Sequence, residues 1–174
     1  LTFTKKAAEE LQARLQTLGL SSPVAAGTFH ALAYSQLQTR WKDLDLPRPP
    51  SVLENRKRIL VPMLPKQLSF DVRESTMNEI NWATARRLNP EAYPAAAEAA
   101  RRKPAVGMNQ ISEFLLQFAQ EKKRLNLIDF DDILEYAIND LTNDPEYAAG
   151  RHWKYRYIFV DEFQDVNPLQ FALL

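Results

Sequence analysis

The start of the chain alternates between short β-prone segments and stretches with helical spacing. Residues 1–4 are rich in Thr and Phe, and apolar residues then recur every three or four positions over 5–18. The apolar run 24–28 predicts a second short buried strand, and residues 29–40 predict a second helix. A loop is expected at 21–23, between the two strand–helix pairs.

The middle of the chain has a different pattern. A Pro-rich stretch at 46–50 breaks the chain, and from about residue 52 to residue 126 the pattern is helical with hardly any strand signal. Further prolines, Pro62 among them, separate the helices from one another. The predicted helices are Leu53–Met63, Glu74–Leu88, Glu91–Arg102 and Asn109–Leu125.

The last part of the chain leads back to a strand. Acidic residues open a predicted helix at Asp129, where the helix dipole favours them, and residues 152–154 fit an exposed loop. The almost wholly apolar run Tyr157–Val160 predicts a third buried strand, and Pro168 is well placed to begin a final helix. Three short buried strands that each lead into a helix or loop indicate an α/β fold with a parallel sheet and mostly helical content. The expected domains are 1–45, a helical insertion at 46–126, and a return to the first domain at 127–174.

Composition excludes several classes of protein. The 174 residues are 45% hydrophobic, which is enough for a folded core. No apolar run approaches the roughly 20 residues of a membrane helix and no signal peptide is visible, so we expect no membrane partner. The chain lacks Cys, which excludes disulfides and thiolate metal sites and fits a cytoplasmic location.

The zero net charge is unevenly distributed. Residues 1–87 hold 13 Lys or Arg and 8 Asp or Glu, whereas residues 88–174 hold 9 and 14. A basic first half is suited to phosphates, although ordinary solvated helices explain it equally well. The sequence begins without Met in a strand pattern and ends in a helix pattern, so we expect an excised piece of a longer protein.

Polar groups gather directly after the third predicted strand. Asp161 and Glu162 follow the apolar run at the carboxyl end of a strand, where open parallel sheets bind ligands. One carboxylate can hold Mg²⁺, and the other can orient or deprotonate a water that attacks a phosphate. Successive strand residues point to opposite faces, so a turn must begin near Glu162 if both are to reach one site. The alternative is that the pair only caps a turn, but the polar residues that follow favour a site. They are Gln164, Asp165, Asn167 and Gln170.

The stretch VDEFQDVNPLQ, from Val160 to Gln170, resembles motif II (Walker B) of the superfamily 1A DNA helicases, the family of UvrD, Rep and PcrA. Val166 stands where that family commonly has Thr. In the same order as in the family, LTFTKKAAEELQARL resembles motif Ia, GTFHALAYSQLQ resembles motif Ib, and IDFDDILEYAI resembles the segment before motif II. The resemblance implies a partial RecA-like sheet of about three parallel strands, and the helical middle matches the position of the family's inserted 1B domain.

The resemblance also implies roles for individual residues. Asp161 would bind the Mg²⁺ of Mg-ATP, Glu162 would activate the hydrolytic water, and Gln164 would help to couple the γ-phosphate to DNA. The implied partner is single-stranded DNA or its junction with duplex. An aromatic ring can stack on any base, so the contact needs no sequence preference. The implied DNA-contacting residues are Phe3, Thr4, Lys5, Thr28, Phe29 and His30. Lys5 stands where the family usually has Asn.

Structural alternatives exist for these residues and for other charged groups. Phe3 can belong to the core, and His30 can be a histidine satisfied at a helix start. We expect the acids at the helix start near Asp129 to cap that helix rather than to act in catalysis. Residues 101–103 and 122–124 fit solvated helix faces, with salt-dependent phosphate contacts as the alternative.

A phosphate-binding loop is not present in the sequence. None of the four glycines precedes Lys and Ser or Thr, and in the family that loop lies upstream of motif Ia. We therefore expect the intact protein to be an ATP-driven DNA translocase, with a 3′-to-5′ polarity that follows from the resemblance. The fragment itself is expected not to hydrolyse ATP at a useful rate and to bind Mg²⁺ weakly or not at all. Two alternatives stay open: the helicase part of a RecB/AddA-like helicase–nuclease, and a non-hydrolysing nucleic-acid-binding module. The aromatic residues after the first two strands argue against a P-loop NTPase that is not a helicase, because nucleotide binding alone gives no reason for them.

Overall fold

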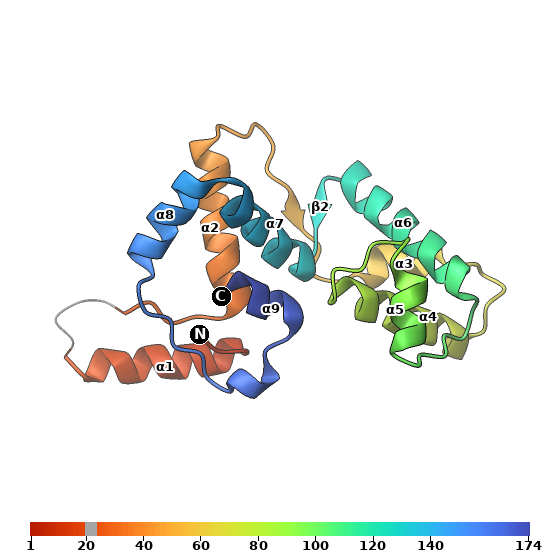
Figure 1. The fold of residues 1–174 in the computed structure, drawn as a ribbon, viewed down its shortest axis with the longest axis horizontal. Helices are drawn as coiled ribbons and strands as arrows, with labels where there is room; N and C mark the ends of the chain where they lie inside the picture. Colours follow the sequence, from red (N-terminus) through yellow and green to blue (C-terminus); the bar gives the residue numbers. More distant parts are fainter. Residues whose placement is uncertain (20–23) are drawn as a thin grey trace. The chain divides into compact units, whose positions relative to one another are not determined.

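Helices make up most of the computed structural model, which describes residues 1–19 and 24–174 (Figure 1). The loop predicted at 21–23 lies outside the described residues. Among the described residues, no helix combines the length and apolar character needed to cross a bilayer. The elements are α1 (Lys5–Thr17), α2 (Phe29–Asp43), β1 (Ser51–Val52), α3 (Lys57–Met63), α4 (Phe70–Thr84), α5 (Tyr93–Ala99), α6 (Met108–Arg124), β2 (Leu127–Ile128), α7 (Phe130–Asn143), α8 (Pro145–Lys154), the 3₁₀ helix η1 (Phe163–Asp165) and α9 (Pro168–Leu173).

The chain divides into two compact units. Unit 1 consists of Leu1–Arg48 and Asp132–Leu174, and unit 2 consists of Pro49–Asp131. Unit 1 therefore contains α1, α2, α8, η1, α9 and most of α7, whereas unit 2 contains α3 to α6 and the β1–β2 pair.

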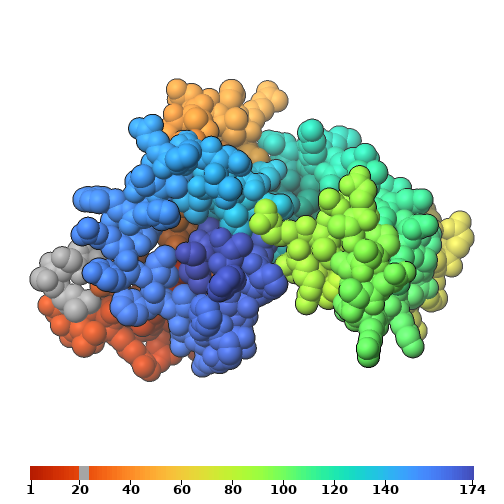
Figure 2. All heavy atoms as spheres, in the orientation of Figure 1, coloured from red at the N-terminus to blue at the C-terminus, as the bar shows by residue number. Residues whose placement is uncertain are grey.

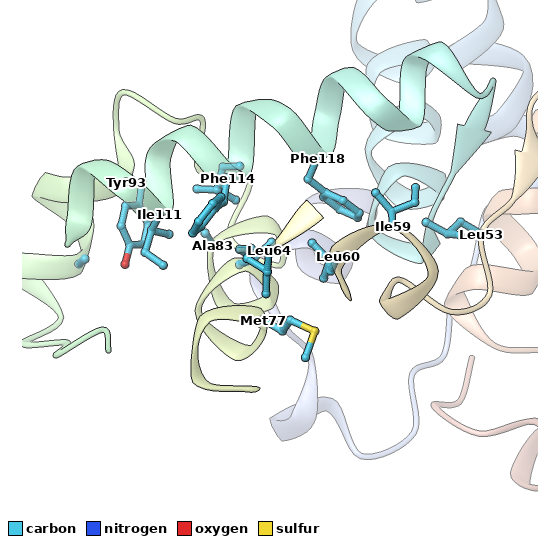
Figure 3. Close-up of a cluster of buried hydrophobic side chains, with 13 residues drawn as sticks. Leu53, Ile59, Leu60, Leu64, Met77, Ala83, Tyr93, Ile111, Phe114 and Phe118 are labelled. Atoms are coloured by element: carbon cyan, nitrogen blue, oxygen red, sulfur yellow. The ribbon is translucent and has the colours of Figure 1, made fainter. Parts of the chain in front are cut away.

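Unit 2 is built around one face of α6. Ile111, Phe114, Leu115 and Phe118 recur at helical spacing, and each is at most 5% exposed. Figure 3 shows Ile111, Phe114 and Phe118 of α6 directed at residues from α3, α4 and α5. The buried residues of this core are Leu53, Ile59, Leu60, Leu64, Met77, Ile80, Ala83, Tyr93, Ala97, Ile111, Phe114, Leu115 and Phe118.

A buried carboxylate also belongs to unit 2. Glu79 accepts hydrogen bonds from the Tyr93 hydroxyl at 2.9 Å and from Arg102 Nε and Nη2 at 2.7 Å each. Burial opposes ionisation of Glu79, but the hydrogen bonds from Arg102 and Tyr93 outweigh it and hold the pKa of Glu79 below its usual value. The prediction of a solvated face at 101–103 is therefore wrong for Arg102, whose guanidinium forms a salt bridge with Glu79.

Regular strands are few among the described residues. β1 and β2 form a parallel pair in which Ser51 lies opposite Leu127 and Val52 opposite Ile128. The prediction of mostly helical content is confirmed, and a small parallel sheet is present, although its two strands are not among the three that were predicted. Sequence patterns missed this pair because each strand has two residues, too few to show a strand periodicity.

The three predicted strands are only partly formed. Thr2 and Thr28 make a single parallel bridge, and 157–160 is not assigned as a strand. The prediction that 24–28 and 157–160 are buried is wrong, since Val24 is 55% exposed, Tyr157 84% and Phe159 82%. Burial of a strand requires elements packed on its two faces, and the described residues do not cover these side chains.

Several helix boundaries differ from the prediction. Helix α3 begins at Lys57 instead of Leu53 but ends at Met63 as predicted, with Pro62 in its last turn. Residues 152–154 belong to α8 instead of a loop, because Asp144 caps this helix and Pro145 is its first residue. The final helix does begin at Pro168, as predicted.

Candidate functional site

Backbone hydrogen bonds join three separated segments of unit 1. The Thr2 amide donates to the Gly27 carbonyl at 3.0 Å, and the Asp161 amide donates to the Leu1 carbonyl at 2.9 Å. The Leu1 amino group also donates to the Phe159 carbonyl, so residue 1 bonds on both sides of Val160 in the manner of a parallel ladder. In Figure 2 the first residues and those after α8 adjoin on the visible face. The segment 1–2 thus lies between 27–28 and 159–161, and all three run in the same direction.

Thr4 and Thr28 each begin a helix just beyond these bonded positions. The Thr4 hydroxyl accepts the Ala7 amide at 3.1 Å, and the Thr28 hydroxyl accepts the Ala31 amide at 3.2 Å. Both residues have extended backbone and serve as N-caps, of α1 and α2 respectively. Their side-chain oxygens therefore have a structural task, while each hydroxyl proton can still be donated.

The N-cap role predicts a measurable loss of stability. Thr28→Ala leaves the Ala31 amide without its side-chain acceptor and is expected to lower the free energy of unfolding by about 1 kcal/mol. Thr39→Ala on the same helix removes an exposed hydroxyl that bonds only to the preceding turn, and should change stability by less than about 0.5 kcal/mol. Urea denaturation of both variants compares them; equal values would remove the capping role.

Phe3 and Phe29 form an aromatic pair between the two strand–helix junctions. Their ring centroids lie 5.7 Å apart at an interplanar angle of 42°. Phe29 is 1% exposed and belongs to the core, whereas Phe3 is half-buried. Of the two aromatic residues expected to contact DNA, only Phe3 presents part of its ring to solvent in this structure.

Two further expected DNA contacts lie at the same helix starts. Lys5 is exposed, and its ammonium group pairs loosely with Glu9 at 3.8 Å along α1. His30 is half-buried at the second position of α2. An exposed pair of this kind contributes little to stability, so Lys5 can exchange Glu9 for a phosphate at small cost.

Asp161 and Glu162 lie at the point where the third segment turns. Glu162 has φ 47° and ψ 48°, a left-handed conformation that is uncommon outside glycine, and η1 follows directly. In an extended chain, successive side chains point to opposite faces. The turn interrupts this alternation, as expected if the carboxylates of Asp161 and Glu162 belong to one site. Both side chains are exposed, and the side-chain amide of Gln164 donates from Nε2 to a carboxylate oxygen of Glu162. Strained backbone of this kind is often found at functional sites.

Asn167 and Gln170 have a structural explanation that the sequence could have provided. The Gln170 amide donates to Asn167 Oδ1 at 2.9 Å, and the Asn167 amide donates to Gln170 Oε1 at 3.0 Å. This reciprocal capping box starts α9. Its signature, a capping residue followed three positions later by Gln, is visible in the sequence, so these two residues add nothing to the case for a site.

An apolar cavity of about 800 Å³ lies in unit 1. It is lined by residues of α1, by 24–27 and by the segment 157–161. The side chains Leu11, Leu15 and Ile158 give it a hydrocarbon lining, which suits burial of apolar groups rather than of phosphate.

Only a limited set of metal ligands is present. In residues 1–19 and 24–174, no group of three or more His, Asp or Glu side chains is arranged to hold a metal ion. Asp161 offers one exposed carboxylate at the end of its segment. This fits Mg²⁺ bound together with a nucleotide, because Mg²⁺ commonly takes one or two carboxylates and fills its other positions with water and phosphate oxygens.

The sequence was also compared with known protein families and with curated proteins. Residues 1–174 match the family described as the UvrD/REP helicase N-terminal domain. The whole chain is 33% identical to the ATP-dependent DNA helicase UvrD2 of Mycobacterium tuberculosis and covers 27% of it. It is 28% identical over its whole length to the ATP-dependent DNA helicase PcrA of Leuconostoc citreum, and 28% identical over 99% of its length to DNA helicase II of Escherichia coli K12, covering 24% of each. The chain therefore spans about a quarter of the length of these relatives.

Proposed function

Since the chain belongs to the UvrD/REP helicase family, we propose that it is part of an ATP-dependent DNA helicase that moves 3′ to 5′ along a single strand. Within it, residues 1–45 and 127–174 contribute to a RecA-like motor domain, and residues 46–126 form an inserted 1B-like domain. The proposed place of action is the cytoplasm, and the proposed partner is single-stranded DNA or its junction with duplex.

One observation carries this proposal. Hydrogen bonds at Thr2 and Asp161 bring three segments side by side, so that their carboxyl ends lie at one edge. These ends carry Thr4, Thr28 and Asp161, two from the proposed DNA contacts and one from the proposed ATP site. A common edge lets a change at the nucleotide be felt at the DNA without a long path between them.

At the nucleotide side, two carboxylates have separate tasks. Asp161 would hold the Mg²⁺ of Mg-ATP, and the metal would supply positive charge to the phosphates. Glu162, placed on the far side of the turn, would orient and deprotonate the attacking water. Gln164 already bonds to Glu162, so it would hold that carboxylate in place and report its state to the neighbouring DNA site.

At the DNA side, contacts come from both strand–helix junctions. The exposed part of the Phe3 ring would stack on a base, with Phe29 supporting it from the core. Lys5 would pair with a phosphate, and the hydroxyls of Thr4 and Thr28 would donate to phosphate oxygens while they cap their helices. His30 would add a further donor at the start of α2. None of these groups reads a base edge, so binding would be independent of sequence.

The chain alone lacks the Gly-rich sequence ending in Lys and Ser or Thr that wraps phosphates. We therefore expect the 174-residue chain by itself to hydrolyse ATP at a negligible rate and to bind Mg²⁺ weakly. The activity belongs to the full-length protein that contains it.

Replacing Phe3 tests the DNA contact. In the full-length protein, Phe3→Ala is expected to weaken single-stranded DNA binding by about 1–3 kcal/mol, because a stacked base loses its aromatic partner. Fluorescence anisotropy with a labelled oligonucleotide measures the affinity, and DNA-stimulated ATP hydrolysis measures the coupling.

Phe70→Ala is the matched control for this experiment. Phe70 is 75% exposed and lies in unit 2, outside the proposed site, so its removal should leave affinity unchanged. Unchanged affinity and stimulation in Phe3→Ala, with the fold retained, would assign Phe3 to the core instead of to DNA.

A further inference from the structure

Four charged side chains are packed together in unit 2, two of them buried (Lys122 and Asp129) and two partly exposed (Arg56 and Asp131). Asp129 is 0% exposed and lies between two cations, with Lys122 Nζ at 2.8 Å from Oδ2 and Arg56 Nη2 at 2.9 Å from Oδ1. The same Arg56 nitrogen lies 2.6 Å from Asp131 Oδ2. Two cations thus face two anions, and the group has no net charge.

The second terminal nitrogen of Arg56 is also used. Its Nη1 donates to Asn81 Oδ1 at 3.0 Å and to Thr84 Oγ1 at 2.9 Å, both on α4. The Phe118 ring lies 5.9 Å from the Arg56 guanidinium and 4.9 Å from Lys122 Nζ. The cluster therefore ties together the start of α3, the end of α4, the end of α6 and the start of α7.

This cluster lies where the chain enters and leaves unit 2. The entering segment forms β1 and the leaving segment forms β2, with Ser51 N–H donating to Asn126 O at 3.0 Å and Leu53 N–H to Ile128 O at 2.7 Å. Arg56 follows β1 closely, and Asp129 comes directly after β2. A parallel pair of two-residue strands is too short to be stable by its own hydrogen bonds, so other contacts must hold the two segments together.

We propose that Arg56, Lys122, Asp129 and Asp131 form an ionic clamp that holds the entering and leaving segments of unit 2 together and fixes the first turn of α7. Asp129 has the central position, because it contacts both cations and its Oδ1 also accepts the Asp131 amide at 3.0 Å. This clamp is a property of unit 2 itself. It goes beyond the proposed helicase function and does not depend on it.

Electrostatics agree with this geometry. Burial opposes the charge of Asp129, but Lys122 and Arg56 outweigh it and hold the pKa of Asp129 below its usual value. Among the groups that face Asp129 are Lys122 from α6, Arg56 from before α3 and Asp131 from α7. Because the folded pKa is lowered, the clamp is complete above the ordinary pKa of Asp and is lost as pH falls through the lowered value.

Hydrogen exchange of the full-length protein, followed at the amides of unit 2, tests the clamp. Asp129→Asn keeps the shape of the side chain but leaves Lys122 and Arg56 without their central anion. The Ser51 and Leu53 amides are expected to exchange at least about tenfold faster, whereas amides in the middle of α6 should stay within about twofold of the wild type. Glu121→Gln is the control, since it removes a charge from a surface pair with Arg124 at the same end of α6 and should change neither set.

A second variant keeps the test decisive if Asp129→Asn does not fold. Arg56→Lys retains the charge but replaces two terminal nitrogens, one on the two carboxylates and one on α4, with a single ammonium group, so the same two amides should exchange faster, by a smaller factor. Exchange rates at Ser51 and Leu53 that match the wild type would overturn the clamp. Exchange that rises equally throughout unit 2 would also overturn it, because the cluster would then support only the general stability of the core.

Discussion

Replacing Glu162 by Gln in the full-length protein is expected to lower the ATP turnover rate by about 10²- to 10⁴-fold while leaving ATP affinity nearly unchanged. Glutamine has the size of the glutamate side chain but cannot accept the proton of the attacking water, and general base catalysis is worth a factor of this order. The backbone turn at Glu162 and the neighbouring Asp161 are retained, so the proposed Mg-ATP contacts persist. Steady-state hydrolysis and equilibrium binding of a labelled nucleotide measure the two effects separately.

Asp165→Asn is a suitable control for Glu162→Gln. Asp165 is an exposed carboxylate in η1, three residues further along the same polar run, and turnover should stay within about twofold of the wild type. Full turnover in Glu162→Gln would remove Glu162 from the mechanism. A wild-type full-length protein that binds DNA without any turnover would instead favour the non-hydrolysing module.

Phe118→Ala should cause a large loss of stability in unit 2, of about 3–5 kcal/mol. Phe118 is 1% exposed on the buried face of α6, and Figure 3 shows its ring among side chains from α3 and from the segment after β1. Truncation removes the apolar contacts of the ring and leaves a cavity that a closely packed core fills only in part. It also removes the ring that Arg56 and Lys122 pack on.

Leu116→Ala on the same helix is the matched control for Phe118→Ala. Leu116 is 48% exposed, and its truncation should cost less than about 0.5 kcal/mol. Hydrogen exchange of the α6 amides reports unit 2 separately from unit 1. Similar exchange in both variants would contradict the assignment of Phe118 to the centre of the core.

Sequence patterns predicted the helices well where an apolar face recurs over several turns. The 17 residues of α6 show this face, and its observed bounds differ from the predicted Asn109–Leu125 by one residue at each end. The alternation of side chains along a strand likewise located the turn at Glu162, because two adjacent carboxylates can reach one site only where the strand ends. The left-handed conformation that makes this turn could not be read from a glutamate, which rarely adopts it.

Long-range pairing was not accessible from the pattern. Lys122 was expected on a solvated face, yet it is buried against Asp129, and Arg56 reaches the same carboxylate from 73 positions away. A charged residue at the end of an apolar stripe gives no sign of its partner, so burial of the pair shows only in three dimensions. The prediction that Tyr157 and Phe159 are buried was wrong for a related reason. An apolar run indicates that its side chains favour burial, but it does not show which elements would pack against them.

At Glu162 the backbone conformation opposes stability to the chemistry proposed for this position. A non-glycine residue held in the left-handed region is strained, and Gly or Asn would occupy the same turn with less strain. Selection for thermal stability alone would thus favour Gly or Asn at this position, and both replacements remove the carboxylate. Retention of glutamate under such selection would mean that the protein is maintained for its turnover and not for its robustness.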